Sequence, residues 1–331
     1  MKKLFFLAVC LFTIQLCIAQ HIELLDSSQN CSFRGLSVVN DQVLWVSGNK
    51  GTVGLSTDAG KTFSWMKVKG FEKTDFRDIE AFDAKTAIIM GIDTPAILLK
   101  TTDGGKSWKK VLEDKRPGMF LDAMEFWNEM SGIVIGDPIN GRIYIARTFD
   151  GGETWRGLPE EYYPVAEKGE AMFASSGTNV RKLAKDEACF ITGGVRSRLF
   201  IRDKKIDLPI LQGKESTGAN SIAVWDRKHF IIVGGDFTNP TSAEKNCILS
   251  NDGGTNFSLP VTAPAGYRSC VEYISKKSLI TCGLTGTDYS ADAGMNWQTI
   301  SSTGFHVVRK AKKGKAVFLA GARGKIGKLI L

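Results

Sequence analysis

An eight-residue pattern recurs five times along this chain and limits the folds that the chain can adopt. Each copy reads Ser/Thr-x-Asp-Gly/Ala-Gly-x-polar-aromatic. The aspartate can accept hydrogen bonds from its own turn, the glycine supplies the positive φ of a tight hairpin, and the terminal Trp or Phe can pack between sheets. The pattern therefore predicts a structural hairpin, repeated around Asp58, Asp103, Asp150, Asp252 and Asp292.

The spacing of these aspartates gives the number of repeated units. They lie 45, 47, 102 and 40 residues apart, and about 40–50 residues is the usual length of a four-stranded propeller blade. The gap of 102 residues spans two units, so a unit without the pattern is expected near 171–210, with strands at 171–174, 188–191 and 199–201. A final unit at 305–331 supplies three strands, and residues 22–25 can provide its fourth.

These units predict an all-β fold, a seven-bladed β-propeller whose ring is closed by an N-terminal strand that completes the last blade. Short apolar runs such as 87–90 and 230–233 fit strands that are buried on both faces. We expect a single propeller over residues 20–331, with blades at approximately 30–68, 74–113, 118–159, 170–210, 217–261, 266–301, and 304–331 together with 21–26.

The first 19 residues have the features of a secretory signal peptide. Lys2 and Lys3 precede an apolar stretch, and Ala19 fits a cleavage site. We therefore expect an exported protein, periplasmic or secreted, with no transmembrane segment in the mature chain. The segment carries two lysines and no acidic residue, so its removal lowers the formal charge from +8 to +6. Scattered charges of this size argue against nucleic acid as a partner.

The cysteines and histidines do not suggest a metal or cofactor site. The whole chain has three histidines, and no two cysteines have CxxC spacing, so we expect no metal. No glycine fingerprint of a dinucleotide-binding fold is present, so we expect no cofactor. The cysteines beyond residue 19 are Cys31, Cys189, Cys247, Cys270 and Cys282. Two interpretations stay open: all five are buried free thiols, or one disulfide joins two of the last three.

The repeated hairpin resembles the Asp-box, or BNR repeat, of sialidases, sortilin-like receptors and photosystem II stability/assembly factor-like proteins. In those families the box lies between the third and fourth strands of a propeller blade. Gly136-Asp137-Pro138, residues 169–178 and Gly266-Tyr267-Arg268-Ser269 also resemble an exported bacterial branch whose members often carry the label "oxidoreductase". The resemblance covers nearly all of residues 20–331 and implies the fold, but no residue pattern supports redox chemistry.

The topology of such propellers sorts the polar residues onto two faces. The Asp-box hairpins lie on one face, and the loops between second and third strands lie on the other, with the connections between blades. Function usually resides on such loops. The candidate ligand-binding residues of that second face are arginines, which can fork onto a carboxylate, and one histidine: Arg34, Arg77, Arg268 and His306.

Two functions are compatible with this face. The first is a non-catalytic binding or assembly propeller, a monomer that presents the face to a glycan or an extracytoplasmic protein. The second, implied by the resemblance to sialidases, is a glycoside hydrolase or uronic-polymer lyase acting on an anionic sugar. Its catalytic residues would be Tyr267 as nucleophile with Glu170 as partner, and Asp137 or Asp236 as acid/base.

The arginine motif separates these two functions in part. Phe33-Arg34-Gly35 resembles the arginine motif of an early sialidase blade, but the expected proline two places after the arginine is absent. We therefore favour the binding propeller. If the protein is an enzyme, we expect a glycoside hydrolase rather than an oxidoreductase.

Overall fold

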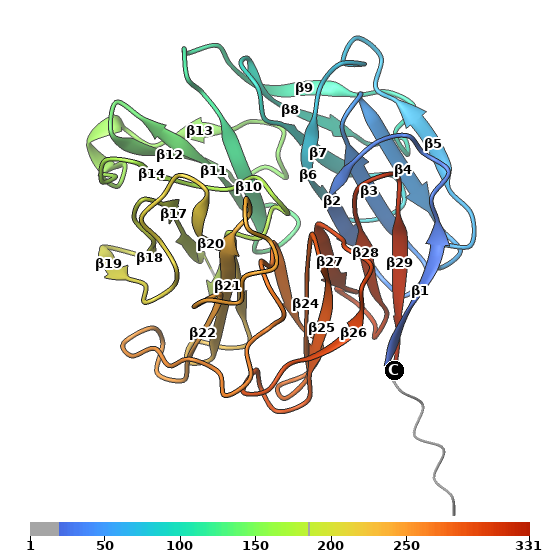
Figure 1. The fold of residues 1–331 in the computed structure, drawn as a ribbon. Helices are drawn as coiled ribbons and strands as arrows, with labels where there is room; N and C mark the ends of the chain where they lie inside the picture. The colour runs from blue at the N-terminus through green and yellow to red at the C-terminus, as the bar shows by residue number, and fades with distance from the viewer. Residues whose placement is uncertain (1–19, 185) are drawn as a thin grey trace, which may run out of the picture.

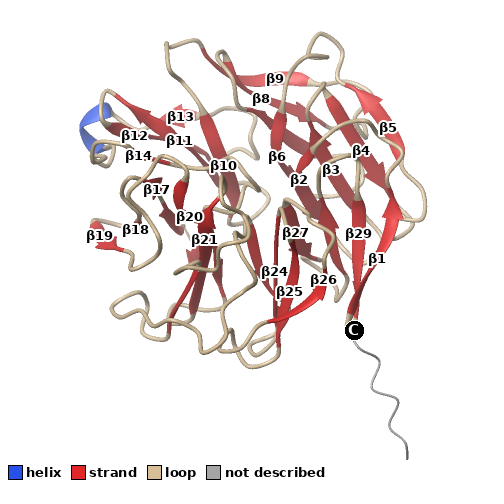
Figure 2. Cartoon of the chain, viewed as in Figure 1, coloured by secondary structure: helices blue, strands red, loops and turns tan. Residues whose placement is uncertain are grey.

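Seven antiparallel sheets surround a central channel in the computed structural model, which describes residues 20–184 and 186–331 (Figure 1). Strands make up almost all of the regular structure (Figure 2), and the helical turn of the described residues is η1 (Glu160–Tyr162). The predicted all-β, seven-bladed propeller is confirmed. The predicted signal peptide lies outside the described residues. No helix in the described part of the chain could cross a membrane.

Four blades have a simple order, in which consecutive strands lie side by side from the channel outwards. Blade 1 consists of β2 (Phe33–Val38), β3 (Leu44–Gly48), β4 (Thr52–Ser56) and β5 (Ser64–Lys67). Blade 2 consists of β6 (Phe76–Ala81), β7 (Ala87–Gly91), β8 (Ala96–Thr101) and β9 (Lys109–Asp114). Blade 3 consists of β10 (Leu121–Phe126), β11 (Gly132–Ile139), β12 (Arg142–Thr148) and β13 (Arg156–Gly157). Blade 6 consists of β23 (Cys270–Tyr273), β24 (Leu279–Gly283), β25 (Gly286–Ser290) and β26 (Gln298–Ser301).

Blade 7 joins the two ends of the described chain. Its sheet has the order β1-β29-β28-β27, built from β27 (Val307–Lys310), β28 (Val317–Ala320), β29 (Ile326–Ile330) and β1 (His21–Asp26). β1 runs antiparallel to β29, with His21 opposite Ile330 and Glu23 opposite Lys328 (Figure 1). This pairing covers the outer edge of the last blade, so the expected closure by an N-terminal strand is confirmed.

Blades 4 and 5 depart from the simple order. The inner strand of blade 4 is β15 (Val180–Ala184), followed by β16 (Glu187–Ile191), β18 (Arg198–Ile201) and β19 (Lys204–Asp207). The strand expected at 171–174 is therefore wrong as the inner strand. Only Glu170 and Ala171 are extended there, as β14, which pairs with β17 (Gly193–Gly194). β17 in turn adds to β20 (Thr217–Val224) of blade 5, which continues with β21 (Phe230–Asp236) and β22 (Cys247–Ser250).

The core lies between the blades. Every residue of β3 and β7 is buried, because each sheet is covered on both faces by its neighbours. The aromatic residue of a box contributes to this packing across blades: the ring of Trp108 meets the ring of Trp45, in the preceding blade, edge to face at 6.4 Å. All five cysteines of the described residues are buried free thiols, and Cys270 faces Cys282 across β23 and β24.

Each Asp-box is held by its own hydrogen bonds. In the first box, Ser56 Oγ donates to Asp58 Oδ1 at 2.8 Å, and Thr62 Oγ1 donates to Asp58 Oδ2 at 2.6 Å. The bond from Thr62 is the largest cause that lowers the pKa of Asp58 to about 2. The same side-chain bonds recur around Asp103, Asp150, Asp252 and Asp292. Each of these aspartates therefore braces its own hairpin.

Candidate functional site

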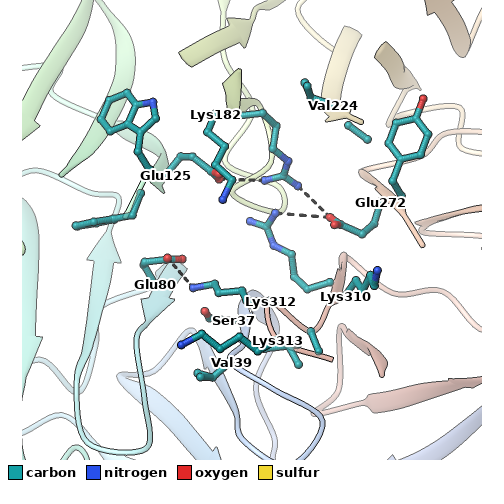
Figure 3. Close-up of a pocket in the computed structure, with 18 of the residues that line it drawn as sticks. Ser37, Val39, Glu80, Glu125, Lys182, Val224, Glu272, Lys310, Lys312 and Lys313 are labelled. Carbon is teal, nitrogen blue, oxygen red and sulfur yellow. Dashed lines mark hydrogen bonds and ion pairs between the residues drawn. The ribbon is translucent and has the colours of Figure 1, made fainter. Parts of the chain in front are cut away.

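A cavity lies at one end of the central channel. It has a volume of about 770 Å³ and is lined by the last residues of the inner strands of all seven blades (Figure 3). An inner strand ends where the loop to its second strand begins, so this end of the channel is fixed by the blade topology. A volume of this size is typical of a ligand site.

The cavity opens on the Asp-box face. In blade 1 the box residue Ala59 donates its backbone N–H to the carbonyl of Gln42, in the loop between the first and second strands. In blade 2 the backbone N–H of the box residue Gly104 donates to the carbonyl of Lys85, which lies in the corresponding loop. The boxes and the rim of the cavity are thus side by side. The sequence interpretation predicted the ligand-binding residues on the opposite face.

Each inner strand contributes one side chain to a ring around the cavity. The ring contains three glutamates and two arginines, with a serine and an alanine between them: Ser37, Glu80, Glu125, Arg181, Ala223, Glu272 and Arg309. Charged residues inside otherwise apolar inner strands cost desolvation unless they are paired. Ion pairs between the charged residues of this ring therefore offset the desolvation cost of placing them in the core.

Arg181 connects two of the glutamates across the cavity floor. Its Nη1 lies 3.5 Å from Glu125 Oε2, and its Nη2 lies 3.4 Å from Glu272 Oε2. Arg309 approaches Glu272 at 4.0 Å. Burial raises the pKa of Glu272 to about 7, although both arginines act to lower it. The ring thus contains a carboxyl group that titrates near neutral pH.

Aromatic residues form part of the cavity wall: Phe82, Phe126, Trp127, Trp225 and Tyr273. Trp225 is 42% exposed, and its ring lies 5.7 Å from the ring of Tyr273. A large, exposed aromatic side chain beside a polar cavity is a typical anchor for a ligand.

A loop from blade 4 closes the channel below the cavity. We call residues 174–178 the channel plug, and all of them are buried. Gly177 packs across the channel against Asp78 of blade 2. A Cβ added to Gly177 would lie 2.3 Å from the carboxyl carbon of Asp78. The plug begins at residue 174, the last residue of the strand predicted at 171–174. It separates the two ends of the channel from each other.

The channel plug bonds to four further blades. Arg34 of blade 1 donates to the carbonyl of Ser175 at 3.3 Å, and Arg309 of blade 7 donates to the carbonyl of Gly177 at 3.1 Å. Ser175 Oγ donates to Asn220 of blade 5, and Ser176 Oγ donates to the carbonyl of Ser269 in blade 6. These bonds hold the plug at the axis of the ring.

The end of the channel opposite the cavity brings together three of the four predicted ligand-binding residues. Arg34 is half-buried, and burial followed by the charge of Arg77 lowers its pKa. Arg77 forms an ion pair with Asp75 at 2.8 Å. His306 is buried, and burial, followed by Arg34, lowers its pKa to about 3. Their ligand-binding role stays a prediction.

Arg268, the fourth predicted ligand-binding residue, lies apart from these three. Its side chain is 0% exposed, and Nε donates to Asp288 Oδ2 at 2.6 Å. Its other nitrogens donate to the carbonyls of Tyr267 and Ala265. The arginine therefore holds together the interior of blade 6, and its complete burial leaves no donor exposed to a ligand.

No hydrogen bond joins the predicted catalytic residues to one another in the described part of the chain. Tyr267 is buried, its hydroxyl donates to Asn220 Oδ1 at 2.8 Å, and burial raises its pKa to about 12. Glu170, its expected partner, is bound by Arg198 and Thr192 instead. The hydroxyl of the candidate nucleophile thus bonds an amide oxygen in place of a base.

The two candidate acid/base aspartates also have structural bonds. Asp137 accepts the backbone N–H of Met172 at 2.8 Å, and burial raises its pKa to about 6. Asp236 accepts the hydroxyl of Thr238 at 2.6 Å, which is the main cause that lowers its pKa. Asp122, which the sequence interpretation missed, is fully buried, and burial followed by the charge of Asp137 raises its pKa.

Comparison with known proteins finds a partial family match and several similar folds. Residues 45–162 match the family model described as photosynthesis system II assembly factor YCF48. A solved structure titled "YCF48 bound to D1 peptide" is 15% identical, with a TM-score of 0.67 over 94% of this chain and 97% of that chain. The chain is a seven-bladed propeller with Asp-box (BNR) repeats, and its fold is similar to that of YCF48.

Two other solved structures place this BNR-repeat propeller among propellers more widely. YCF48 from Cyanidioschyzon merolae is 15% identical, with a TM-score of 0.65 over 93% of this chain and 98% of that chain. The WD40 β-propeller domain of Doa1 is 14% identical, with a TM-score of 0.64 over 94% and 97%. At such identities the likeness shows the fold alone. None of the curated proteins compared with the chain matches it.

The cavity residues of this BNR-repeat propeller were missed by the sequence interpretation, although one signal was available. Glu80 and Glu125 interrupt their inner strands at equivalent positions, as Glu272 does in a later blade. Charged residues at one position of successive buried strands indicate a shared polar space. The sequence interpretation instead predicted a site on the long loops of the opposite face.

Proposed function

We propose that this protein is an exported, non-catalytic binding propeller that holds a segment of a partner protein in the cavity on the Asp-box face. The observation that carries the proposal is the cavity itself, which is built from the inner strands of all seven blades and lined by aromatic and charged side chains. Export rests on the signal-like sequence of residues 1–19.

The geometry of the predicted catalytic residues favours binding over hydrolysis. A tyrosine nucleophile needs a base that accepts its proton. The hydroxyl of Tyr267 bonds the amide oxygen of Asn220, and Glu170 is occupied by Arg198. A tyrosine with a pKa of about 12 and no basic partner is a poor nucleophile at neutral pH.

A protein segment is the ligand class with the most support. The structure titled "YCF48 bound to D1 peptide" shows that a propeller with this fold can bind a peptide. The volume of about 770 Å³ is large enough for several side chains. A glycan is the second candidate, because the exposed ring of Trp225 beside Tyr273 offers a stacking surface.

A matched pair of aromatic variants tests which end of the channel binds. Trp225 stands at the cavity and is 42% exposed, and Phe237 stands in a loop of the opposite face and is 40% exposed. The ring of Trp225 contacts Tyr273, and the ring of Phe237 contacts Tyr267 and Phe173. Replacement of either by alanine should therefore perturb the fold to a similar, small extent.

The assay is a peptide array of 12-residue segments probed with purified residues 20–331, beside a glycan array. Wild type should bind a subset of the peptides, Trp225→Ala should lose most of that binding, and Phe237→Ala should keep it. The opposite result would place the working surface around Arg34 and Arg77. Binding to glycans alone would replace the protein segment by a sugar, and binding to neither array would refute the proposal.

A further inference from the structure

The acidic side chains of the cavity are largely neutralised by groups of the protein. Glu80 bonds Lys312 at 2.6 Å, and Glu125 and Glu272 share Arg181. Asp226 accepts bonds within its own turn and from His229. Glu129 is the exposed acid of the lining for which no such bond exists among the described residues.

Several basic side chains of the cavity, in contrast, have no acidic partner among the described residues. Lys182, Lys310 and Lys313 line it, and none of them forms an ion pair with any residue that the structure describes. They come from two sides: Figure 3 shows Lys182 across the cavity from Lys313, with Lys310 nearer to Glu272. The uncompensated charge of the lining is therefore positive.

Arg181 adds unsatisfied donors at the floor. Its side chain is 9% exposed, and its Nη1 has no hydrogen bond although Glu125 lies 3.5 Å away. A buried guanidinium nitrogen without an acceptor is costly. A ligand oxygen that reached the floor would satisfy it.

We propose that the cavity recognises an acidic protein segment, with two carboxylates set apart by at least one apolar residue. One carboxylate lies against Lys182 and Arg181, the other lies against Lys310 and Lys313, and the apolar side chain between them packs on Trp225. This inference rests on the proposed function and names the chemistry of its ligand. Complementary charge of this kind gives specificity and speeds association.

The probes are three fluorescent 12-residue peptides that differ in one residue type. The first repeats Glu-Leu-Glu-Gly, and the other two carry Gln or Lys in place of Glu. Measured by fluorescence anisotropy with residues 20–331, the Glu peptide should bind at least tenfold more tightly than the Gln peptide, and the Lys peptide should bind least. The affinity for the Glu peptide should fall as salt is raised, since exposed charges are screened.

Two charge-reversal variants locate the effect. Lys182→Glu with Lys310→Glu should weaken binding of the Glu peptide at least tenfold. Lys204→Glu with Lys205→Glu is the matched control, because it changes the net charge equally on β19, the exposed outer strand of blade 4. This control should change the affinity less than twofold at 0.15 M salt.

The outcomes separate this inference from the proposed function. Equal binding of the Glu and Gln peptides, or equal loss in the two variants, would overturn the acidic preference and leave peptide binding intact. Tighter binding of an oligogalacturonate than of the Glu peptide would overturn it in favour of a uronate polymer. Failure of every peptide, here and on the array, would refute the proposed function.

Discussion

Arg268 is the predicted site residue whose role the structure changes most, and its replacement gives a sharp test. From the sequence it is a candidate ligand-binding arginine on the loop face, and an exposed ion pair contributes only roughly 0–1 kcal/mol to stability. In the structure its side chain is 0% exposed and that of its partner Asp288 is 1% exposed. Arg268→Ala would leave the carboxylate of Asp288 buried with Thr299 Oγ1 and the backbone N–H of Ala265 as its donors.

The expected magnitude follows from this burial. Removal of one partner of a buried ion pair costs about 3–5 kcal/mol, because the other charge stays desolvated. Arg77→Ala is the matched control, since Arg77 pairs with Asp75 at 2.8 Å but is 28% exposed. A partly exposed pair of this kind contributes roughly 0–1 kcal/mol. Two arginines at comparable places in the sequence should therefore differ several-fold in their effect on the free energy of unfolding.

The assay is urea unfolding of residues 20–331 at pH 7, followed by tryptophan fluorescence, with the double variant Arg268→Ala/Asp288→Ala included. The double variant should be no less stable than Arg268→Ala, because it removes the stranded charge together with its partner. A loss of less than about 1 kcal/mol in Arg268→Ala would refute the structural role. A strictly additive double variant would refute the ion pair as its cause.

Three further predictions concern closure, acid stability and ligand binding. Deletion of residues 20–26 removes β1, exposes the edge of β29 and should lower the melting temperature by many degrees; an unchanged melting temperature would contradict closure by β1. Asp58, Asp103 and Asp150 have pKa values of about 2, below the ordinary value, so their contribution to stability is complete above about pH 4 and is lost as the pH falls towards 2. Thermal unfolding between pH 6 and pH 2.5 measures this loss, and Asp103→Asn should reduce the slope. Glu272, which faces Arg181, Arg309, Glu125 and Cys270, has a pKa of about 7 and is mostly protonated at pH 6. The acidic peptide should therefore bind more tightly at pH 6 than at pH 8, and an equal pH dependence in Glu272→Gln would show that another group is responsible.

The number and order of the blades could be predicted from the sequence because the Asp-box is a local structure. All of its defining side-chain bonds join residues at most four positions apart, as between Ser56, Asp58 and Thr62. Such bonds depend little on the rest of the fold, so the same residues recur wherever the hairpin recurs. The pairing of β1 with β29 was predictable for a related reason, since three strands in the last unit leave one edge unpaired.

The place and chemistry of the site were decided by contacts between distant parts of the chain. Arg181, Glu125 and Glu272 come from three different blades, and Arg34 meets the carbonyl of Ser175 across 141 positions of the sequence. Whether a charged side chain of an inner strand is paired depends on which blades face it across the channel. The spacing of residues in one chain carries no such information.

The two arginines near the start of inner strands show this limit most clearly. Arg34 and Arg268 follow an aromatic residue in the same pattern, Phe33-Arg34 and Tyr267-Arg268, and the sequence assigned them one role. Arg34 bonds the channel plug, whereas Arg268 pairs with Asp288 inside its own blade. A buried guanidinium lies where carboxylates and carbonyls can satisfy it, and the position of those acceptors is a property of the assembled ring.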